Sequence, residues 1–165
     1  MPEEDYISLA HLARDKELDV RFIEMMPIGL GKKFGIVSGE QVYSILKNKF
    51  GEAAECTGRF GNGPAVYVHF PGFKGKIGFI DAVSHQFCNT CNRVRLTSEG
   101  YLKPCLQYGT GSDLRKLLRS GADDTAVRHE MRRTIYDKPA CHHFADCISG
   151  TGQTLETRDM SQIGG

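Results

Sequence analysis

Three cysteines in one short stretch restrict the fold of this chain more than any other feature. Cys88, Cys91 and Cys105 have the spacing C-x2-C-x13-C. Between the last two, the stretch 93–104 alternates polar and apolar residues, turns at Gly100 and then continues as a second short strand. That pattern predicts a β-hairpin, which brings Cys105 back beside Cys91. Three converging thiols are typical of a metal site.

The spacing alone fits two kinds of metal site. A 4Fe–4S cluster held by the thiolates of Cys88, Cys91 and Cys105 leaves one iron with an open coordination position, which can bind a substrate atom. Alternatively, His85 extends the pattern to H-x2-C-x2-C-x13-C, which fits a structural zinc site. The second interpretation is a zinc-binding Cys3His structural or interaction module without catalysis.

Two arginines follow the second cysteine at strand spacing. Side chains at positions i, i+2 and i+4 of a strand share a face, so Cys91, Arg93 and Arg95 are predicted to point the same way. Paired guanidinium groups bind phosphate oxygens through forked hydrogen bonds. A structural zinc site gains nothing from these cations, whereas an open iron gains a binding site for an anionic ligand. The alternative for both arginines is an exposed face of the hairpin.

Composition excludes several broad classes. The chain has 165 residues, enough for one domain with a core, and a formal net charge of +1, which gives no bulk attraction to nucleic acid or membrane. No apolar run approaches the ~20 residues of a membrane span, and the acidic start does not resemble a signal peptide. We expect a cytoplasmic protein with reduced thiols, no membrane partner and no nucleic-acid partner. Cys56, Cys141 and Cys147 match no metal spacing and are predicted to be free thiols.

The first thirty residues predict a helix that leads into a strand. The helix, over 3–17, has an apolar face with helical spacing, made of Tyr6, Leu9, Ala10 and Ala13. The strand, over 19–26, contains Glu24, which is either catalytic or salt-bridged to a lysine or arginine. A helix feeding a strand is the second half of a βαβ unit, and no first strand precedes it, so the chain is expected to begin in mid-fold.

The rest of the chain predicts helices and strands in a mixed order. Ser38 and Gln41 form a capping box for a helix that stops at Gly51. Further elements are strands over 65–70 and 76–83, a helix capped by Ser112 with Leu114, Leu117 and Leu118 inward, and a helix that starts at Asp123 or Asp124. Residues 140–165 lack periodicity and predict an extended, partly mobile tail.

Four segments resemble one known family. RFIEMMPIG, HQFCNTCNRVRLTSEGYLKPCL, SDLRKLLRSGA and the terminal MSQIGG are similar to the C-terminal part of the radical S-adenosylmethionine GTP 3′,8-cyclases of molybdenum-cofactor biosynthesis. The resemblance covers essentially the whole chain. It implies an α/β to α+β fold: the end of an incomplete TIM-type barrel over 1–30, a cluster-binding region with antiparallel strands and helices over 31–139, and an extended tail over 140–165.

The resemblance also implies roles for particular residues. Cys88, Cys91 and Cys105 would hold a 4Fe–4S cluster with an open iron, and the segment Arg93-Val94-Arg95 would form part of the GTP site. Met26 would lie against S-adenosylmethionine. Gly164 and Gly165 would be the family's double-glycine tail, which reaches into the active site.

One departure limits what this chain is expected to do alone. The family's C-x3-C-x2-C motif, which holds a second 4Fe–4S cluster and generates the radical from S-adenosylmethionine, is absent from the sequence. We therefore expect a segment that is inactive by itself and whose partners are GTP and a missing N-terminal barrel half. An opened barrel unit also exposes apolar surface and a strand edge, which predicts a possible homodimer.

Overall fold

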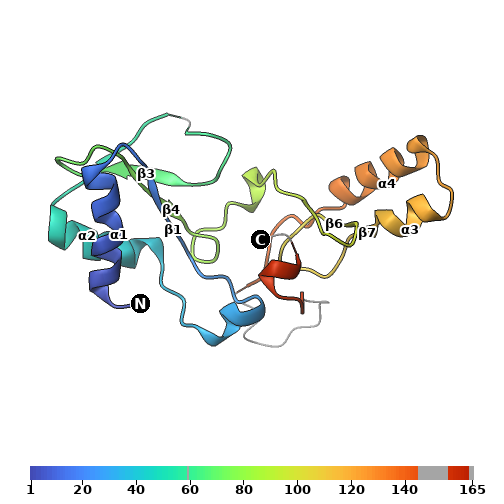
Figure 1. Ribbon diagram of the computed structural model, residues 1–165, viewed down its shortest axis with the longest axis horizontal. Helices are drawn as coiled ribbons and strands as arrows, with labels where there is room; N and C mark the ends of the chain where they lie inside the picture. Colours follow the sequence, from blue (N-terminus) through green and yellow to red (C-terminus); the bar gives the residue numbers. More distant parts are fainter. Residues whose placement is uncertain (59, 145–155, 164–165) are drawn as a thin grey trace. The chain divides into compact units, whose positions relative to one another are not determined.

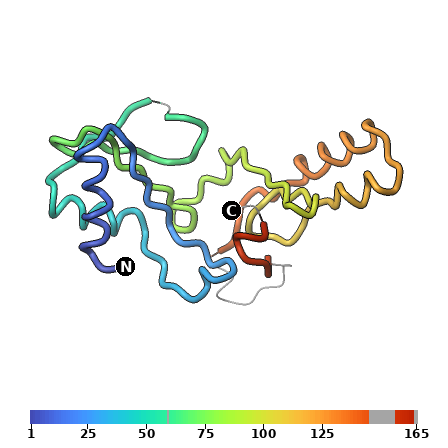
Figure 2. Tube along the Cα trace, in the orientation of Figure 1, coloured from blue at the N-terminus to red at the C-terminus, as the bar shows by residue number. Residues whose placement is uncertain are grey.

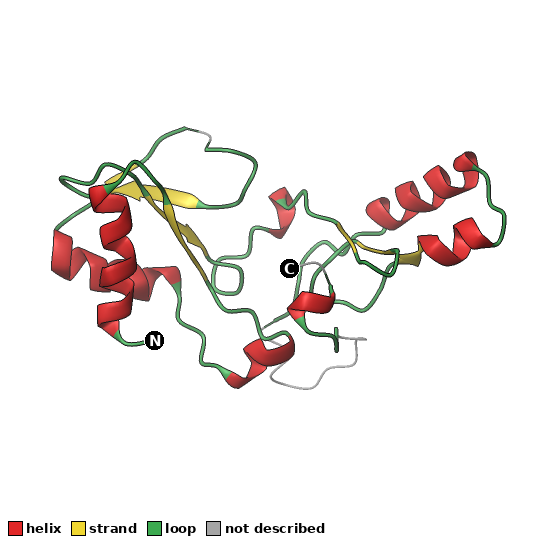
Figure 3. Cartoon of the chain, in the orientation of Figure 1, coloured by secondary structure: helices red, strands yellow, loops and turns green. Residues whose placement is uncertain are grey.

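The computed structural model describes residues 1–58, 60–144 and 156–163. The chain forms two compact units: unit 1 contains residues 1–25 and 35–87, and unit 2 contains residues 26–34 and 88–165. Figures 1 and 2 trace the chain through both units, and Figure 3 shows their helices and strands. Each unit is described by itself.

Unit 1 is a four-stranded mixed sheet with two helices. Its elements are α1 (Glu3–Asp15), β1 (Val20–Ile23), α2 (Gly39–Phe50), β2 (Ala54–Glu55), β3 (Val66–His69) and β4 (Ile77–Ile80). The strand order is β1-β4-β3-β2, with β1 parallel to β4 and the other pairs antiparallel. The predicted helix and strands are therefore present, and β1 has one unpaired edge because β4 is its only neighbour in the described sheet.

The core of unit 1 lies between the sheet and its two helices. Helix α1 packs against α2 and β1, and its buried side chains are Tyr6, Ala10 and Ala13. Leu9, predicted to share that face, is 41% exposed. The buried stripe is therefore narrower than the sequence pattern indicates, because the small side chains of Ala10 and Ala13 bring α1 close to its neighbours.

Helix α2 begins as the sequence predicts. The Ser38 hydroxyl accepts a hydrogen bond from the Gln41 N–H at 3.3 Å, and the Gln41 side chain accepts one from the Ser38 N–H at 2.9 Å. The helix ends at Phe50, and Gly51 follows with a φ of +89°. The capping box prediction is confirmed, since both of its hydrogen bonds come from residues three positions apart.

Glu24 has a structural role in unit 1 that the sequence analysis did not predict. Its carboxylate is 4% exposed and accepts hydrogen bonds from the N–H groups of Val83 at 2.7 Å and Ser84 at 2.9 Å. Among the described residues, the hydrogen-bond partners of this side chain belong to the turn after β4, and no lysine or arginine is one of them. Of the two alternatives, the salt bridge is not formed among the described residues: both N–H groups donate to Oε2, and the buried Oε1 has no hydrogen-bond partner there.

Unit 2 contains a small antiparallel sheet and two helices. Its elements are η1 (Gly29–Lys33), η2 (Cys88–Thr90), β5 (Arg95–Leu96), β6 (Tyr101–Lys103), β7 (Ser112–Asp113), α3 (Leu114–Arg119), α4 (Asp124–Tyr136) and η4 (Met160–Gln162). The strand order is β5-β6-β7. Figure 3 shows α3 and α4 following the sheet as a helical hairpin.

Two predictions about α3 were wrong. Asp113, not Ser112, caps the helix by accepting from the Lys116 N–H at 2.8 Å. Ser112 lies in β7, and its hydroxyl contacts Thr134 Oγ1 of α4 at 2.6 Å. It therefore does not cap α3. Leu118, predicted inward, is 54% exposed because this six-residue helix is anchored through Leu114.

The described residues confirm a mixed α/β fold and contain no closed barrel. The partial TIM-type barrel stays a prediction, as do the domain boundaries at 30 and 139. Within the same residues, no helix combines the length and the apolar character that crossing a bilayer requires.

Candidate metal centre

The cysteine hairpin has the predicted register. Strands β5 and β6 are antiparallel, with Arg95 opposite Lys103 and Leu96 opposite Leu102. The ladder stops at Arg95 and Lys103, so the pairing of position 93 with Cys105 stays a prediction. The hairpin therefore runs in the direction that returns the third cysteine toward the first two.

The turn of the hairpin depends on one glycine. The Thr97 N–H donates to the Tyr101 carbonyl at 3.0 Å, and the Gly100 N–H donates to the Thr97 carbonyl at 2.9 Å. Gly100 has a φ of +82°, and a Cβ there would meet the Cβ of Arg115 at 2.8 Å. Only glycine avoids both the left-handed strain and the collision, so the sequence fixes this turn locally.

The extended strand predicted from Cys91 onward is shorter than expected. Cys88 to Thr90 form a 3₁₀ turn, in which the Cys91 N–H donates to the Cys88 carbonyl at 3.2 Å, and β5 starts only at Arg95. Residues 91–94 have no regular structure. Shared strand spacing therefore does not explain where the arginines lie relative to Cys91.

The three thiols nevertheless interact electrostatically. Cys88, Cys91 and Cys105 are all half-buried. Burial raises the pKa of the Cys88 thiol, and negative charge on Cys105 and Cys91 raises it further, while a hydrogen bond from a backbone N–H opposes both effects. This effect on the pKa of Cys88 requires the sulfurs of Cys91 and Cys105 to lie within electrostatic range of it. In the part of the chain that the structure describes, no three histidine, cysteine or acidic side chains are already arranged around a metal position.

Two of the sulfur atoms accept hydrogen bonds. The His142 N–H donates to Cys88 Sγ at 3.4 Å, and the Lys138 ammonium donates to Cys91 Sγ at 3.3 Å. Hydrogen bonds of this kind stabilise a thiolate, which is the form that ligates iron or zinc. Three thiols, two of which have an N–H group directed at their sulfur, have the ligand chemistry of an iron–sulfur cluster.

A half-buried cation accompanies the cysteines. Burial lowers the pKa of the Arg95 guanidinium, the charges of Cys91 and Cys105 raise it, and the neighbouring charge of Arg93 lowers it. Arg95 therefore lies within electrostatic range of two predicted ligands and of the second arginine. Arg93 and Val94 are exposed. That Arg93 and Arg95 point the same way as Cys91 stays a prediction.

Two other predicted site residues, Met26 and His85, belong to different units. Met26 belongs to unit 2, is half-buried, and follows β1, which ends at Ile23. His85, the fourth ligand of the zinc interpretation, belongs to unit 1, where its Nδ1 lies 3.4 Å from Ser84 Oγ. Gly164, Gly165 and Cys147 lie outside the described residues.

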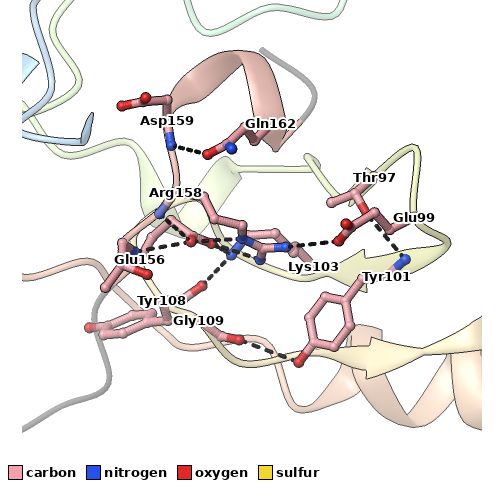
Figure 4. Close-up of polar contacts among 11 residues, drawn as sticks. Thr97, Glu99, Tyr101, Lys103, Tyr108, Gly109, Glu156, Arg158, Asp159 and Gln162 are labelled. Carbon is pink, nitrogen blue, oxygen red and sulfur yellow. Dashed lines mark hydrogen bonds and ion pairs between the residues drawn. The ribbon is translucent and has the colours of Figure 1, made fainter. Parts of the chain in front are cut away.

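A buried ion pair ties residues 156–163 to the hairpin, and the sequence analysis missed it. The Lys103 ammonium and the Glu156 carboxylate pair directly, with side chains 0% and 2% exposed. Lys103 also donates to the Tyr108 carbonyl at 2.6 Å, and Arg158 donates to both carboxylate oxygens of Glu156 at 3.0 Å, as Figure 4 shows. No local pattern predicts this pair, because its members are 53 positions apart.

The remaining described residues of the predicted tail are also ordered against unit 2. Met160 to Gln162 form a 3₁₀ turn. At its start, the Asp159 N–H donates a hydrogen bond to the Gln162 side chain at 2.9 Å. Ile163 is fully buried. An extended course thus does not describe residues 156–163, since a buried ion pair and an apolar anchor hold them.

The ion pair makes the free energy of unfolding depend on pH in the acid range. Burial alone raises the pKa of Glu156, but the hydrogen bonds from Arg158 and Lys103 outweigh it and lower the pKa to about 2, from 4.5. Because the folded-state pKa is the lower one, this stabilisation is complete above about pH 4.5 and is lost as the pH falls toward 2. We expect the urea midpoint to fall between about pH 6 and about pH 3, and to fall less in Glu156→Gln. Equal falls in both proteins would contradict this assignment.

Comparison with known proteins identifies the class to which this cysteine hairpin belongs. The model of the Molybdenum Cofactor Synthesis C family matches residues 18–144, which include all three cysteines and both arginines. The chain belongs to this family.

Individual relatives are longer than this chain. It is 42% identical to the GTP 3′,8-cyclase of Clostridium perfringens over 163 residues, which are 99% of this chain and 49% of the relative. It is 40% identical to that of Trichormus variabilis over 167 residues, and 39% identical to that of Heliobacterium modesticaldum over 166 residues, with 99% of this chain and 50% of each relative covered. The chain spans about half the length of these curated relatives.

Proposed function

We propose that this chain is the cluster- and GTP-binding portion of a GTP 3′,8-cyclase, with Cys88, Cys91 and Cys105 as ligands of a 4Fe–4S cluster. The observation that carries the proposal is that N–H donors contact the sulfurs of Cys88 and Cys91, with Arg95 in electrostatic range of Cys91 and Cys105. When bound, a cluster with three protein ligands supplies an open iron that accepts a ligand atom. The family match and the names of the relatives support GTP as that ligand.

The residues around the cysteines would have different roles in binding. Arg95, with Arg93 beside it, offers forked N–H donors and positive charge to phosphate oxygens. Hydrogen bonds from Lys138 and from the His142 N–H would position two of the ligand sulfurs. Met26 next to S-adenosylmethionine, and Gly164 and Gly165 within the active site, are further parts of the proposal.

Turnover needs chemistry that this chain does not carry. The motif C-x3-C-x2-C is absent from its sequence, so we propose that radical generation depends on the N-terminal half found in the longer relatives. The chain alone should bind GTP without converting it. The zinc-module interpretation receives no support from the comparisons, and His85 interacts with its own neighbours in unit 1.

GTP binding tests the role of the arginines. We expect Arg95→Met to weaken GTP binding by the anaerobically reconstituted chain about 10- to 100-fold, since hydrogen bonds to charged groups contribute about 1.5–3 kcal/mol each. Equilibrium dialysis with labelled GTP measures this effect. Arg119→Met, at an exposed position of α3, is the matched control and should bind like the unchanged chain. Equal affinities for Arg95→Met and the control would refute the assignment.

A further inference from the structure

Lys138 connects the end of helix α4 to the loop that carries the second cysteine. It follows α4 by two residues and is half-buried. Its ammonium donates to the Cys91 carbonyl at 2.8 Å, to the Arg93 carbonyl at 2.8 Å and to Cys91 Sγ at 3.3 Å. A lysine ammonium has three N–H donors, so these three acceptors satisfy it completely.

The two carbonyls explain the shape of the loop. Residues 91–94 have no ladder partner that would fix their backbone, because β5 begins only at Arg95. One ammonium binding the carbonyls of Cys91 and Arg93 turns both groups toward the same point. The conformation of the loop is thereby imposed by a side chain 45 to 47 positions away in the sequence.

The third hydrogen bond places a positive charge against a sulfur that we propose as a cluster ligand. The reduction potential of an iron–sulfur cluster rises with hydrogen bonds to its sulfurs and with nearby positive charge, because both stabilise the more negative reduced state. Among the described residues, this is the only side-chain ammonium that donates a hydrogen bond to a cysteine sulfur.

We propose that Lys138 is a positioning residue of the cluster site: it fixes the loop 91–93 and raises the reduction potential of the cluster through its hydrogen bond to Cys91. This inference rests on the proposed function, since it requires a cluster on Cys88, Cys91 and Cys105. It assigns a role in the site to a residue of the helical region, well outside the cysteine motif.

Redox titration of the anaerobically reconstituted chain tests the inference. Lys138→Met should shift the midpoint potential to a more negative value and lower the iron affinity, measured against a competing chelator, about tenfold or more. Lys138→Arg retains the positive charge and should keep the potential closer to that of the unchanged chain. Arg132→Met, an exposed position of α4, is the control and should change neither quantity.

Hydrogen exchange in the iron-free chain gives a readout that does not depend on a cluster. Lys138→Met should increase exchange in peptides covering residues 88–95, with peptides from α4 unchanged as evidence that the helix still folds. Failure of the unchanged chain to take up iron and sulfide would overturn the proposed function. Normal uptake with the same potential in Lys138→Met and in the unchanged chain would overturn this inference alone, as would a loss in Lys138→Arg as large as in Lys138→Met.

Discussion

Replacing Glu156 with glutamine is expected to lower the free energy of unfolding by about 3–5 kcal/mol, because it leaves a buried cation without its counter-charge. The Lys103 side chain is fully buried, and among the described residues it would keep the Tyr108 carbonyl and an uncharged amide in place of the carboxylate. Urea unfolding followed by circular dichroism measures the loss. Peptide-resolved hydrogen exchange should assign it to β6 and its neighbours in unit 2, while peptides from α1 and α2 in unit 1 keep their protection.

Two further variants separate the ion pair from other effects of the substitution. Glu52→Gln makes the same chemical change in the exposed pair of Lys47 and Glu52, and no measurable loss is expected there. Combining Glu156→Gln with Lys103→Met removes both charges and should recover much of the stability, since a neutral buried pair has no unpaired ion. A loss in Glu156→Gln no larger than in Glu52→Gln would show that the buried pair does not hold residues 156–163.

The second large effect concerns the third cysteine. Cys105→Ser should abolish the visible absorption that reconstitution with iron and sulfide produces, since two remaining thiolates do not hold a cubane cluster firmly. Cys56→Ser is the matched control: it removes one thiol from unit 1, outside the hairpin, and should leave the absorption unchanged. Circular dichroism of both variants checks that the hairpin change has not unfolded the chain.

Two other outcomes would contradict the assignment of Cys105 as a ligand. If Cys105→Ser retained the full absorption, Cys105 would not be a ligand and the hairpin register would have no bearing on the metal. If Cys56→Ser lost as much visible absorption as Cys105→Ser, iron and sulfide would be bound by thiols in both units. That result would contradict a defined site at the hairpin.

Local signals were sufficient for the elements whose hydrogen bonds are local. The capping box at Ser38 joins residues three positions apart, and the turn at Gly100 requires a φ that glycine adopts freely, so both could be predicted from sequence. The hairpin register followed from the same turn. These features place Cys88 and Cys91 in the turn and loop before β5, and Cys105 two residues after β6.

Features that depend on distant partners escaped prediction. Glu24 Oε2 accepts hydrogen bonds from N–H groups 59 and 60 positions later, and the Ser112 hydroxyl contacts helix α4 instead of capping α3. Lys138 belongs to the cysteine loop only through contacts across 45 or more positions. Side chains of this kind have no sequence pattern, because a lysine that binds two carbonyls and a lysine facing solvent look identical in the chain.

The central claim is that the sulfurs of a folded-back hairpin hold an iron–sulfur cluster. Quantifying iron, acid-labile sulfide and zinc in the chain purified and reconstituted without oxygen tests it most directly. The account predicts a brown protein with about four iron and four sulfide per chain, bleached by dithionite. A colourless protein with about one zinc per chain, which unfolds on chelation, would contradict it.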